Sequence, residues 1–382
     1  MHSNSLSSDD TPALRTLFSD RSWPDVSLPP PSTLQGKTVL VSGAGGSLGQ
    51  RLVRTLCRFP VGRILALDAS EHMLVRLQSR LRDRISKGDG VLPSVQYILG
   101  DLRLPTDRRR ALSCEPDIVI HAAAYKHVPF LEDRPIAAVE NNLLATIDWA
   151  QDCREAGVDR FVFVSTDKAV APTSVMGRTK QLGEQWFRGS RSAMGGSNEH
   201  APPSTTVRLC NLFGSRGSVV PRFLRRLEAE APLPVTHPDM HRWFMAPTDA
   251  SQAVVWALTV PPGTYVPTSC LYVSIPTLAR RMIQWAWPET DPDDWIRWVG
   301  CRPGERLQEQ LWGGGEESLP TDVSSLRRVE TPLDTSSLPE RVACLREACA
   351  EGETEVVHRL LKRRAEEGES EEASPRPEVR DY

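Results

Sequence analysis

Five short apolar runs, each followed by a stretch with the period of an amphipathic helix, restrict this chain to a small set of folds. Parallel sheets need such crossover helices between their strands. The runs are continuously apolar, as expected for strands that are buried on both faces of a sheet. The sequence therefore predicts an α/β fold, a Rossmann-type doubly wound parallel sheet, with strands over residues 38–43, 63–68, 95–101, 117–123 and 160–166.

The first predicted strand runs directly into a glycine-rich turn and then into a helical pattern. Gly43, Gly46 and Gly49 have the spacing of a dinucleotide-binding turn, in which glycines allow a tight bend, a close approach to a pyrophosphate and close helix packing. Ser47 and Leu48 open the helical pattern, and the amino terminus of that helix is expected to face the phosphates.

Asp68 ends the second predicted strand, about twenty residues beyond the last glycine, where a carboxylate accepts hydrogen bonds from an adenosine ribose. A carboxylate at this position would repel a 2′-phosphate, so the sequence favours NAD over NADP as the cofactor. Asp68 is equally placed to cap the following helix, and both roles stay open.

A second group of polar residues follows the fifth predicted strand, where the carboxyl ends of parallel strands line the ligand crevice. Here Thr166, Asp167 and Lys168 place an acid beside an ammonium group. Further along, Met176 and Lys180 are one helical turn apart on the same face. This is the spacing of the Tyr-x-x-x-Lys pair of short-chain dehydrogenases, with methionine at the tyrosine position.

Several longer segments resemble the UDP-N-acetylglucosamine 4,6-dehydratase family, the polysaccharide-biosynthesis branch of the extended short-chain dehydrogenases. They are VSGAGGSLG (41–49), HAAAYKHVP (121–129), VSTDKAVAPTSVMGRTK (164–180), NLFGSRGSVVP (211–221), THPDMHRWFM (236–245) and RPGERL (302–307). The resemblance covers residues 37 to about 360. One departure is Ala171, where the family has asparagine before Pro172. Relatives often carry an amino-terminal membrane region, and we expect none here.

The resemblance implies a lyase, a nucleotide-sugar 4,6-dehydratase that uses NAD and a UDP-linked amino sugar. In that chemistry NAD takes a hydride from C4 of the sugar and later returns it to C6. Lys168 is expected to remove the C5 proton and Asp167 to protonate the departing C6 hydroxyl. Lys180 is expected to hold the nicotinamide ribose.

Met176 cannot accept the C4 hydroxyl proton as a tyrosinate would, because a thioether is not a base. We expect Thr166 or Ser165 to take this proton and to pass it to Asp167. The methionine is typical of one branch of the family, so it does not by itself indicate a lost activity.

The resemblance also implies a set of binding residues. Those expected near the cofactor are Asp101 and Leu102 at the adenine, and the small residues Ala122, Ala123 and Ala124. Those expected near the nucleotide sugar are Lys126, His127, Asn211, Arg216, Ser218, Val219, Arg242, Arg302 and Glu305. Ser218 and Val219 are expected at a helix amino terminus. His127 receives no catalytic role, since a core histidine is an equally good interpretation.

Composition narrows the class of protein further. The formal net charge of −3 gives no whole-chain field for nucleic acid, and no apolar run reaches the length of about 18 residues that spans a bilayer. The eight cysteines show no zinc or disulfide spacing, and we expect no metal site. We therefore expect a cytoplasmic protein, and a homo-oligomer because closed oligomers are common.

The chain divides into four predicted parts. Residues 1–36 form an extended amino-terminal arm, since the Pro29–Pro31 run resists helix and sheet. Residues 37–200 form the NAD-binding domain, and residues 201–364 form a nucleotide-sugar-binding lobe that ends in a helix pair broken at Gly352. Residues 365–382 are acidic, poor in apolar side chains and predicted to be disordered.

Two other functions remain open at this stage. A nucleotide-sugar 4-epimerase could share the scaffold, but its chemistry leaves Lys168 beside Asp167 unexplained. A non-catalytic NAD-binding protein is supported by Met176 alone.

Overall fold

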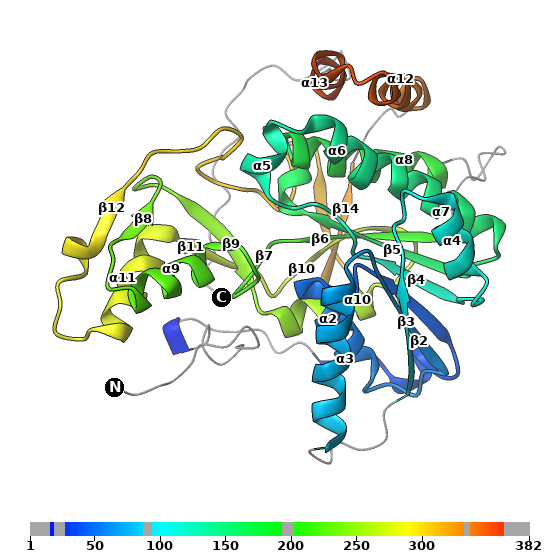
Figure 1. Cartoon of the computed structure of the whole chain (residues 1–382), viewed down its shortest axis with the longest axis horizontal. Coiled ribbons are helices and arrows are strands. Elements are labelled where there is room, and N and C mark those ends of the chain that lie inside the picture. The colour runs from blue at the N-terminus through cyan, green and yellow to red at the C-terminus, as the bar shows by residue number, and fades with distance from the viewer. Residues whose placement is uncertain (1–15, 19–26, 87–92, 193–201, 332–336, 363–382) are drawn as a thin grey trace.

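The computed structural model of the protein describes residues 16–18, 27–86, 93–192, 202–331 and 337–362. At its centre lies a main sheet with the strand order β13-β14-β10-β6-β5-β4-β1-β2-β3 (Figure 1). Neighbouring strands from β3 to β10 are parallel, and β14 and β13 add an antiparallel edge. The strands are β1 (Thr38–Ser42), β2 (Arg63–Asp68), β3 (Ser94–Leu99), β4 (Ile118–His121), β5 (Arg160–Thr166), β6 (Ser204–Leu209), β10 (Gly263–Pro267), β13 (Glu317–Pro320) and β14 (Leu326–Glu330).

This architecture confirms the predicted Rossmann-type α/β fold. All five strands predicted from the apolar runs are present, and their ends differ from the prediction by at most two residues. The expected burial on both faces is wrong for β3, where exposed and less exposed residues alternate and Leu99 is 51% exposed. The reason is position: β3 is the outermost strand and has a neighbour on one side only.

Helices cover both faces of the main sheet (Figure 1). Successive residues of β1 show how: Leu40 belongs to the same core cluster as Trp149 of α7, whereas Val39 and Val41 belong to the cluster that contains Leu52 of α2. One face is covered by α2 (Ser47–Leu56), α3 (Glu71–Ser86) and α10 (Pro247–Trp256). The other is covered by α4 (Pro105–Leu112), α5 (Val128–Glu132), α6 (Pro135–Val139), the π-helical turn η2 (Glu140–Leu144), α7 (Ala145–Glu155) and α8 (Val175–Ser192).

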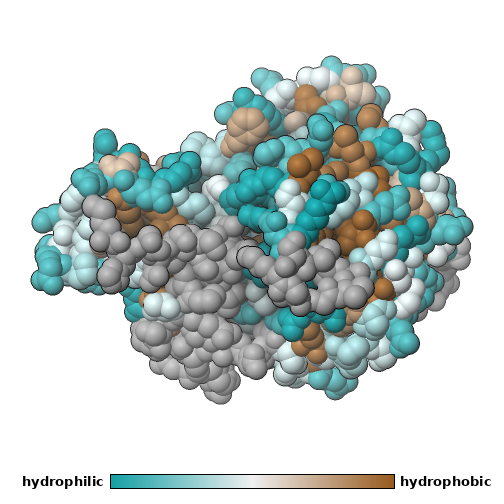
Figure 2. Space-filling model, turned by 60° about the horizontal axis from the view of Figure 1, so that its bottom comes forward, coloured by the Kyte–Doolittle hydropathy of each residue, from teal (hydrophilic) through white to brown (hydrophobic). Residues whose placement is uncertain are grey.

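A smaller lobe projects from one end of the main sheet, at the left of Figures 1 and 2. Its own core includes Phe223 of α9, Phe244 of β9 and Leu278 of α11. The lobe consists of β7 (Asn211–Leu212), α9 (Val219–Glu228), β8 (Leu233–Val235), β9 (His241–Met245), β11 (Leu271–Ser274), α11 (Ile275–Ala286), the 3₁₀ turn η4 (Pro292–Trp295) and β12 (Ile296–Trp298).

The predicted boundary at residue 200 does not coincide with the edge of the sheet. Strands β6, β10, β14 and β13 all lie beyond that residue, yet they extend the main sheet. The predicted helix pair is present as α12 (Leu338–Ala350) and α13 (Thr354–Lys362), with Gly352 at a φ of 75° between them. It packs against α6 and α8 of the main sheet's helical layer, where Leu345 and Val357 join Val139 in one cluster, rather than against the lobe.

The amino-terminal arm is described only in part. Leu17 and Phe18 are buried in the core of the lobe, and Arg281 of α11 donates to the Leu17 carbonyl at 2.8 Å. Within the segment predicted to be extended, Pro31–Leu34 forms a 3₁₀ turn, η1. Proline is tolerated there because it stands at the first position of the turn, where its missing N–H is not needed.

Residues 365–382 lie outside the described residues. None of the described helices has the length and apolarity to cross a bilayer.

Candidate active site

The glycine turn between β1 and α2 is tightly packed against the start of the segment after β4. Gly43 has a φ of 72°, and a Cβ there would lie 2.7 Å from the Cα of Ala123. A Cβ on Gly49 would lie 2.0 Å from the Gly43 carbonyl oxygen. Gly46 is the N-cap of α2, which has no acidic residue in its first turn. These positions exclude side chains because the backbone itself closes the turn.

Asp68 fastens this turn to the end of β2. Its Oδ2 accepts the Gly45 N–H at 2.9 Å, and its Oδ1 accepts the Ser70 N–H at 2.9 Å. One carboxylate oxygen thus holds the glycine turn, and the other holds the start of the segment that leads into α3. A carboxylate has about four acceptor positions, so room remains for ribose hydroxyls.

The other predicted cofactor residues lie along the same carboxyl edge of the sheet. Ser47 and Leu48 are the first two residues of α2. Leu102 is buried and Asp101 is half-buried beyond β3, where hydrogen bonds from Arg103 hold the pKa of Asp101 below its ordinary value. The half-buried Ala122 and Ala124 flank Ala123 after β4.

Three polar side chains meet at the carboxyl end of β5. Asp167 is fully buried, and its Oδ1 accepts hydrogen bonds from Thr166 Oγ1 at 2.8 Å and from Lys168 Nζ at 2.9 Å. Its Oδ2 is buried without a hydrogen-bond partner among the described residues. Lys168 Nζ also donates to Asn211 Oδ1 at 3.2 Å. A buried carboxylate oxygen without a partner is costly unless a ligand hydroxyl satisfies it.

The structure separates Thr166 from Ser165. Ser165 Oγ donates to Glu184 Oε1 at 2.5 Å, whereas Thr166 Oγ1 donates to Asp167. Only Thr166 therefore has the hydrogen bond that a proton relay to Asp167 requires.

Lys180 and Met176 lie deeper in the fold. Lys180 is 5% exposed and donates from Nζ to the Val164 carbonyl at 2.9 Å. Burial, opposed by the charge of Glu184, lowers the pKa of Lys180 to about 8. Met176 is buried in the cluster that contains Val139, so its thioether fills the core. Ala171, in the loop before α8, has a φ of 40°, a left-handed conformation that asparagine adopts more readily than alanine.

A pocket that is open to solvent lies against Lys168. It brings together three residues predicted from the sequence, namely Lys168, Arg242 and Glu305, with Arg306 and Glu309, which were not predicted. We call it the lysine pocket. Arg242 donates to the carbonyls of His241 and Leu307, at 2.7 and 3.2 Å, which fixes its side chain at the rim.

Glu309 is the most informative of the residues that sequence reasoning missed. It is 6% exposed, and its Oε2 has no hydrogen-bond partner among the described residues. Burial raises the pKa of Glu309, with Lys168 opposing and Asp167 adding to the shift. The only sequence signal was its position shortly after the RPGERL segment.

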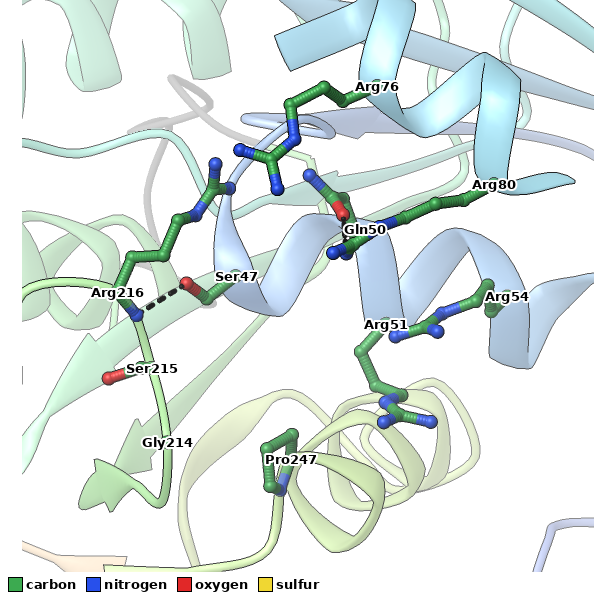
Figure 3. A pocket seen from close by; sticks show the side chains of 10 residues that line it. All are labelled: Ser47, Gln50, Arg51, Arg54, Arg76, Arg80, Gly214, Ser215, Arg216 and Pro247. Atoms are coloured by element: carbon green, nitrogen blue, oxygen red, sulfur yellow. Dashed lines mark hydrogen bonds between the residues drawn. The ribbon is translucent and has the colours of Figure 1, made fainter. Parts of the chain in front are cut away.

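Arg216 does not line the lysine pocket. It lines a second pocket beside α2, where its backbone N–H donates to Ser47 Oγ at 3.3 Å (Figure 3). Its Nη2 also donates to the Gly45 carbonyl at 2.6 Å. We call this the arginine pocket, because five arginines line it: Arg51, Arg54, Arg76, Arg80 and Arg216.

The remaining predicted substrate residues lie around the loop that carries Arg216. Lys126 donates to the Arg216 carbonyl at 2.7 Å, and His127 packs against Gly217, where a Cβ would lie 2.4 Å from its ring. Ser218 is the N-cap of α9 and Val219 its first residue, so the predicted helix amino terminus is confirmed. Arg302 is exposed, and its N–H donates to Glu305 Oε2 at 3.0 Å.

Comparison with known proteins identifies the family of this chain. The family model described as "Polysaccharide biosynthesis protein" matches residues 39–331. This chain belongs to the polysaccharide biosynthesis protein family. The match spans both the glycine turn and the Thr166–Lys168 segment, so the two groups of polar residues lie within the family region.

Two curated proteins are informative relatives of this chain. The capsular polysaccharide biosynthesis protein CapD of Staphylococcus aureus is 35% identical over 286 residues, which cover 74% of this chain and 46% of CapD. The chain thus spans about half the length of that relative. A UDP-N-acetylglucosamine 4,6-dehydratase (inverting) of Campylobacter jejuni is 30% identical over 294 residues, with coverage of 74% and 79%.

Solved structures show the same fold. Pen from Bacillus thuringiensis superposes with a TM-score of 0.70 at 26% identity, over 79% of this chain and 91% of Pen. Further matches carry the names of nucleotide-sugar 4,6-dehydratases and 4-epimerases, several of them in complex with NAD.

Proposed function

We propose that this chain is an NAD-dependent 4,6-dehydratase that acts on UDP-N-acetylglucosamine or a close relative. Its relatives are nucleotide-sugar dehydratases and epimerases, which supports an enzyme of this general kind. The observation that carries the finer proposal is the buried Asp167, which contacts Lys168 and retains one oxygen without a partner. An acid and a base side by side suit an elimination, which must remove one proton and deliver another.

The residues present fit a dinucleotide. The turn at Gly43 and Gly49 leaves no room for side chains, and α2 begins there without an acidic residue, as a helix that faces a pyrophosphate requires. Asp68 would hold the adenosine ribose, and Lys180 the nicotinamide ribose. When bound, NAD would supply an acceptor for a hydride from C4 and return that hydride to C6.

Thr166 and Asp167 would accept the proton of the C4 hydroxyl. Thr166 Oγ1 already donates its hydrogen to Asp167, so its oxygen is free to accept a hydrogen from the sugar while it passes its own to the carboxylate. Asp167 then holds that proton until the C6 hydroxyl departs as water. The proton leaves from Oδ1, the atom that receives it from Thr166, and we assign to the free Oδ2 a hydrogen bond from a sugar hydroxyl.

Lys168 would exchange a proton with C5. The 4-keto group acidifies the C5 hydrogen, and the free amine of Lys168 removes it as the C6 hydroxyl leaves. A proton from the resulting ammonium group, whose hydrogens exchange with solvent, returns to C5 when C6 is reduced. Both side chains therefore end the cycle in the state in which they began, and the sugar has lost one water. Asn211 keeps the Lys168 Nζ in position through its Oδ1.

The lysine pocket would hold the rest of the substrate. Arg242 offers a planar fork that pairs with two phosphate oxygens, and Ser218 and Val219 offer backbone N–H groups at the start of α9. Glu305 lines the pocket and accepts a hydrogen bond from the Arg302 N–H, and these two residues would contact the nucleoside.

The test is incubation of the purified chain with UDP-N-acetylglucosamine and NAD, followed by mass spectrometry and proton NMR of the sugar nucleotide. The proposal predicts a product lighter by one water. A product of unchanged mass that carries the opposite configuration at C4 would identify an epimerase instead. Unchanged substrate, with every other UDP-hexose tested in parallel also unchanged, would refute the proposal.

A further inference from the structure

The arginine pocket gathers cationic side chains from three segments of the chain. Arg51 and Arg54 come from α2, Arg76 and Arg80 from α3, and Arg216 from the loop that precedes α9. Among the described residues that line it there is no aspartate or glutamate. Figure 3 shows the guanidinium groups of Arg76 and Arg216 pointing toward one another beside the first turns of α2.

Neutral groups hold Arg80 and Arg216 in place. Arg80 Nη1 donates to Gln50 Oε1 at 2.6 Å, and Arg216 Nη2 donates to the Gly45 carbonyl at 2.6 Å. Arg76 makes no hydrogen bond or ion pair with any residue that the structure describes. Burial, and then repulsion from Arg76 and Arg80, lowers the pKa of Arg216. The three cations are thus close enough to destabilise one another.

Such an arrangement costs stability unless something negative enters it. Clusters of like charge without a counter-ion are expected at binding sites, where the ligand supplies the missing charge. Guanidinium groups match phosphate oxygens in geometry as well as in charge. A single phosphate monoester carries a charge of only about −2, so the three cations Arg76, Arg80 and Arg216 suit two or more linked phosphoryl groups better.

We propose that the arginine pocket binds the phosphoryl groups of an anionic ligand and that its occupancy alters the glycine turn. The connection runs through Gly45. Its carbonyl accepts hydrogen bonds from Gln50 Nε2 at 2.7 Å and from Arg216, while its N–H donates to Asp68. A ligand that draws Arg80 and Arg216 away from Gln50 and Gly45 therefore changes the hydrogen bonds of the residue that Asp68 holds. The coupling to NAD rests on the proposed function, whereas the anion site does not.

The phosphoryl groups have two chemically possible sources. One is a separate ligand with a phosphate chain, and the other is the 2′-phosphate of NADP, whose ribose would lie at Asp68. Charge favours the separate ligand, because Arg76, Arg80 and Arg216 together carry more charge than one 2′-phosphate neutralises and because the Asp68 carboxylate repels a phosphate.

The test is calorimetric titration of the full chain with inorganic tripolyphosphate. The test variant is Arg76→Ala with Arg80→Ala. The matched control, Arg109→Ala with Arg225→Ala, removes the same charge from exposed positions on α4 and α9 that do not line the pocket. We expect wild type and control to bind alike and the test variant to bind at least about tenfold more weakly. Equal binding by all three proteins, or no binding by wild type, would overturn the proposal.

Parallel titrations with NAD and NADP separate the two sources. Equal affinity for both dinucleotides, with tripolyphosphate changing the affinity for NAD in wild type but not in the test variant, supports a separate ligand. Tighter binding of NADP that falls to the level of NAD in the test variant supports the 2′-phosphate. Because these measurements record binding, they remain decisive even if no sugar nucleotide is turned over.

Discussion

Removal of Arg208 should destabilise the main sheet far more than removal of an arginine at the surface. Arg208 of β6 is 2% exposed and donates to Glu184 of α8 at 2.7 Å and to Glu316, just before β13, at 2.6 Å. Burial by itself would lower the pKa of Arg208, but the two carboxylates raise it above its ordinary value. The three side chains form a buried ion network that joins β6 to the antiparallel edge and to the helix that carries Lys180.

The Arg208→Met variant keeps an unbranched side chain and leaves two buried carboxylates without their cation. Loss of one partner from a buried network costs about 3–5 kcal/mol in unfolding free energy. With a urea dependence of about 3 kcal/mol per molar, the unfolding midpoint should fall by about 1–1.7 M. Urea titrations followed by tryptophan fluorescence and by circular dichroism measure this shift.

The matched control is Arg280→Met, which removes the exposed pair that Arg280 forms with Asp293 at 2.8 Å. Exposed pairs contribute about 0–1 kcal/mol, so this midpoint should move by at most about 0.3 M. Equal shifts in the two variants would refute the network as a source of stability. A triple variant that combines Arg208→Met with Glu184→Leu and Glu316→Leu should recover most of the loss, because no uncompensated charge remains.

Three further predictions concern the site. Because burial lowers the pKa of Lys180 to about 8, turnover should fall as pH rises through that value, and Lys180→Arg, whose cation persists, should remove this fall from the pH-rate profile. The unfolding free energy of wild type should rise by roughly 3 kcal/mol between about pH 8 and pH 10.4, because in that range only the unfolded chain still binds a proton at this lysine. Gly49→Ala should cost about 2 kcal/mol or more and weaken NAD binding in calorimetry, whereas Gly313→Ala, whose Cβ has no contact shorter than 3.6 Å, should do neither. Thr166→Val should reduce turnover about 10²-fold or more and Thr166→Ser far less; unchanged turnover of the valine variant would exclude the relay.

The strands of the amino-terminal half could be predicted because short apolar runs between helical patterns form few structures other than buried strands. Strand β6 could not, because STTVRL carries three hydroxyls and an arginine and does not resemble a buried strand. All six of its residues are nevertheless buried. Arg208 is tolerated there because its carboxylate partners come from α8 and from beyond residue 315, and such a pairing cannot be read from local sequence.

In the candidate site, too, residues adjacent in sequence could be predicted and residues from distant segments could not. Asp167, Lys168 and Thr166 are consecutive, so their meeting at the end of β5 was predictable from the strand itself. Glu309 reaches the lysine pocket from a loop far along the chain, and nothing in its local pattern distinguishes it from an exposed carboxylate. Arg216 shows a further limit, since an arginine suits either pocket and only the path of its loop decides between them.

The central claim is that Lys168 and Asp167 carry out an elimination across C5 and C6. The most direct test is to incubate wild type, Lys168→Ala and Asp167→Asn with UDP-N-acetylglucosamine and NAD in D₂O, and to follow the sugar by proton NMR. The account predicts that wild type forms a C6 methyl group and exchanges the C5 hydrogen for deuterium, and that neither variant forms the methyl group at a comparable rate. A wild-type rate of methyl formation in Lys168→Ala would contradict it.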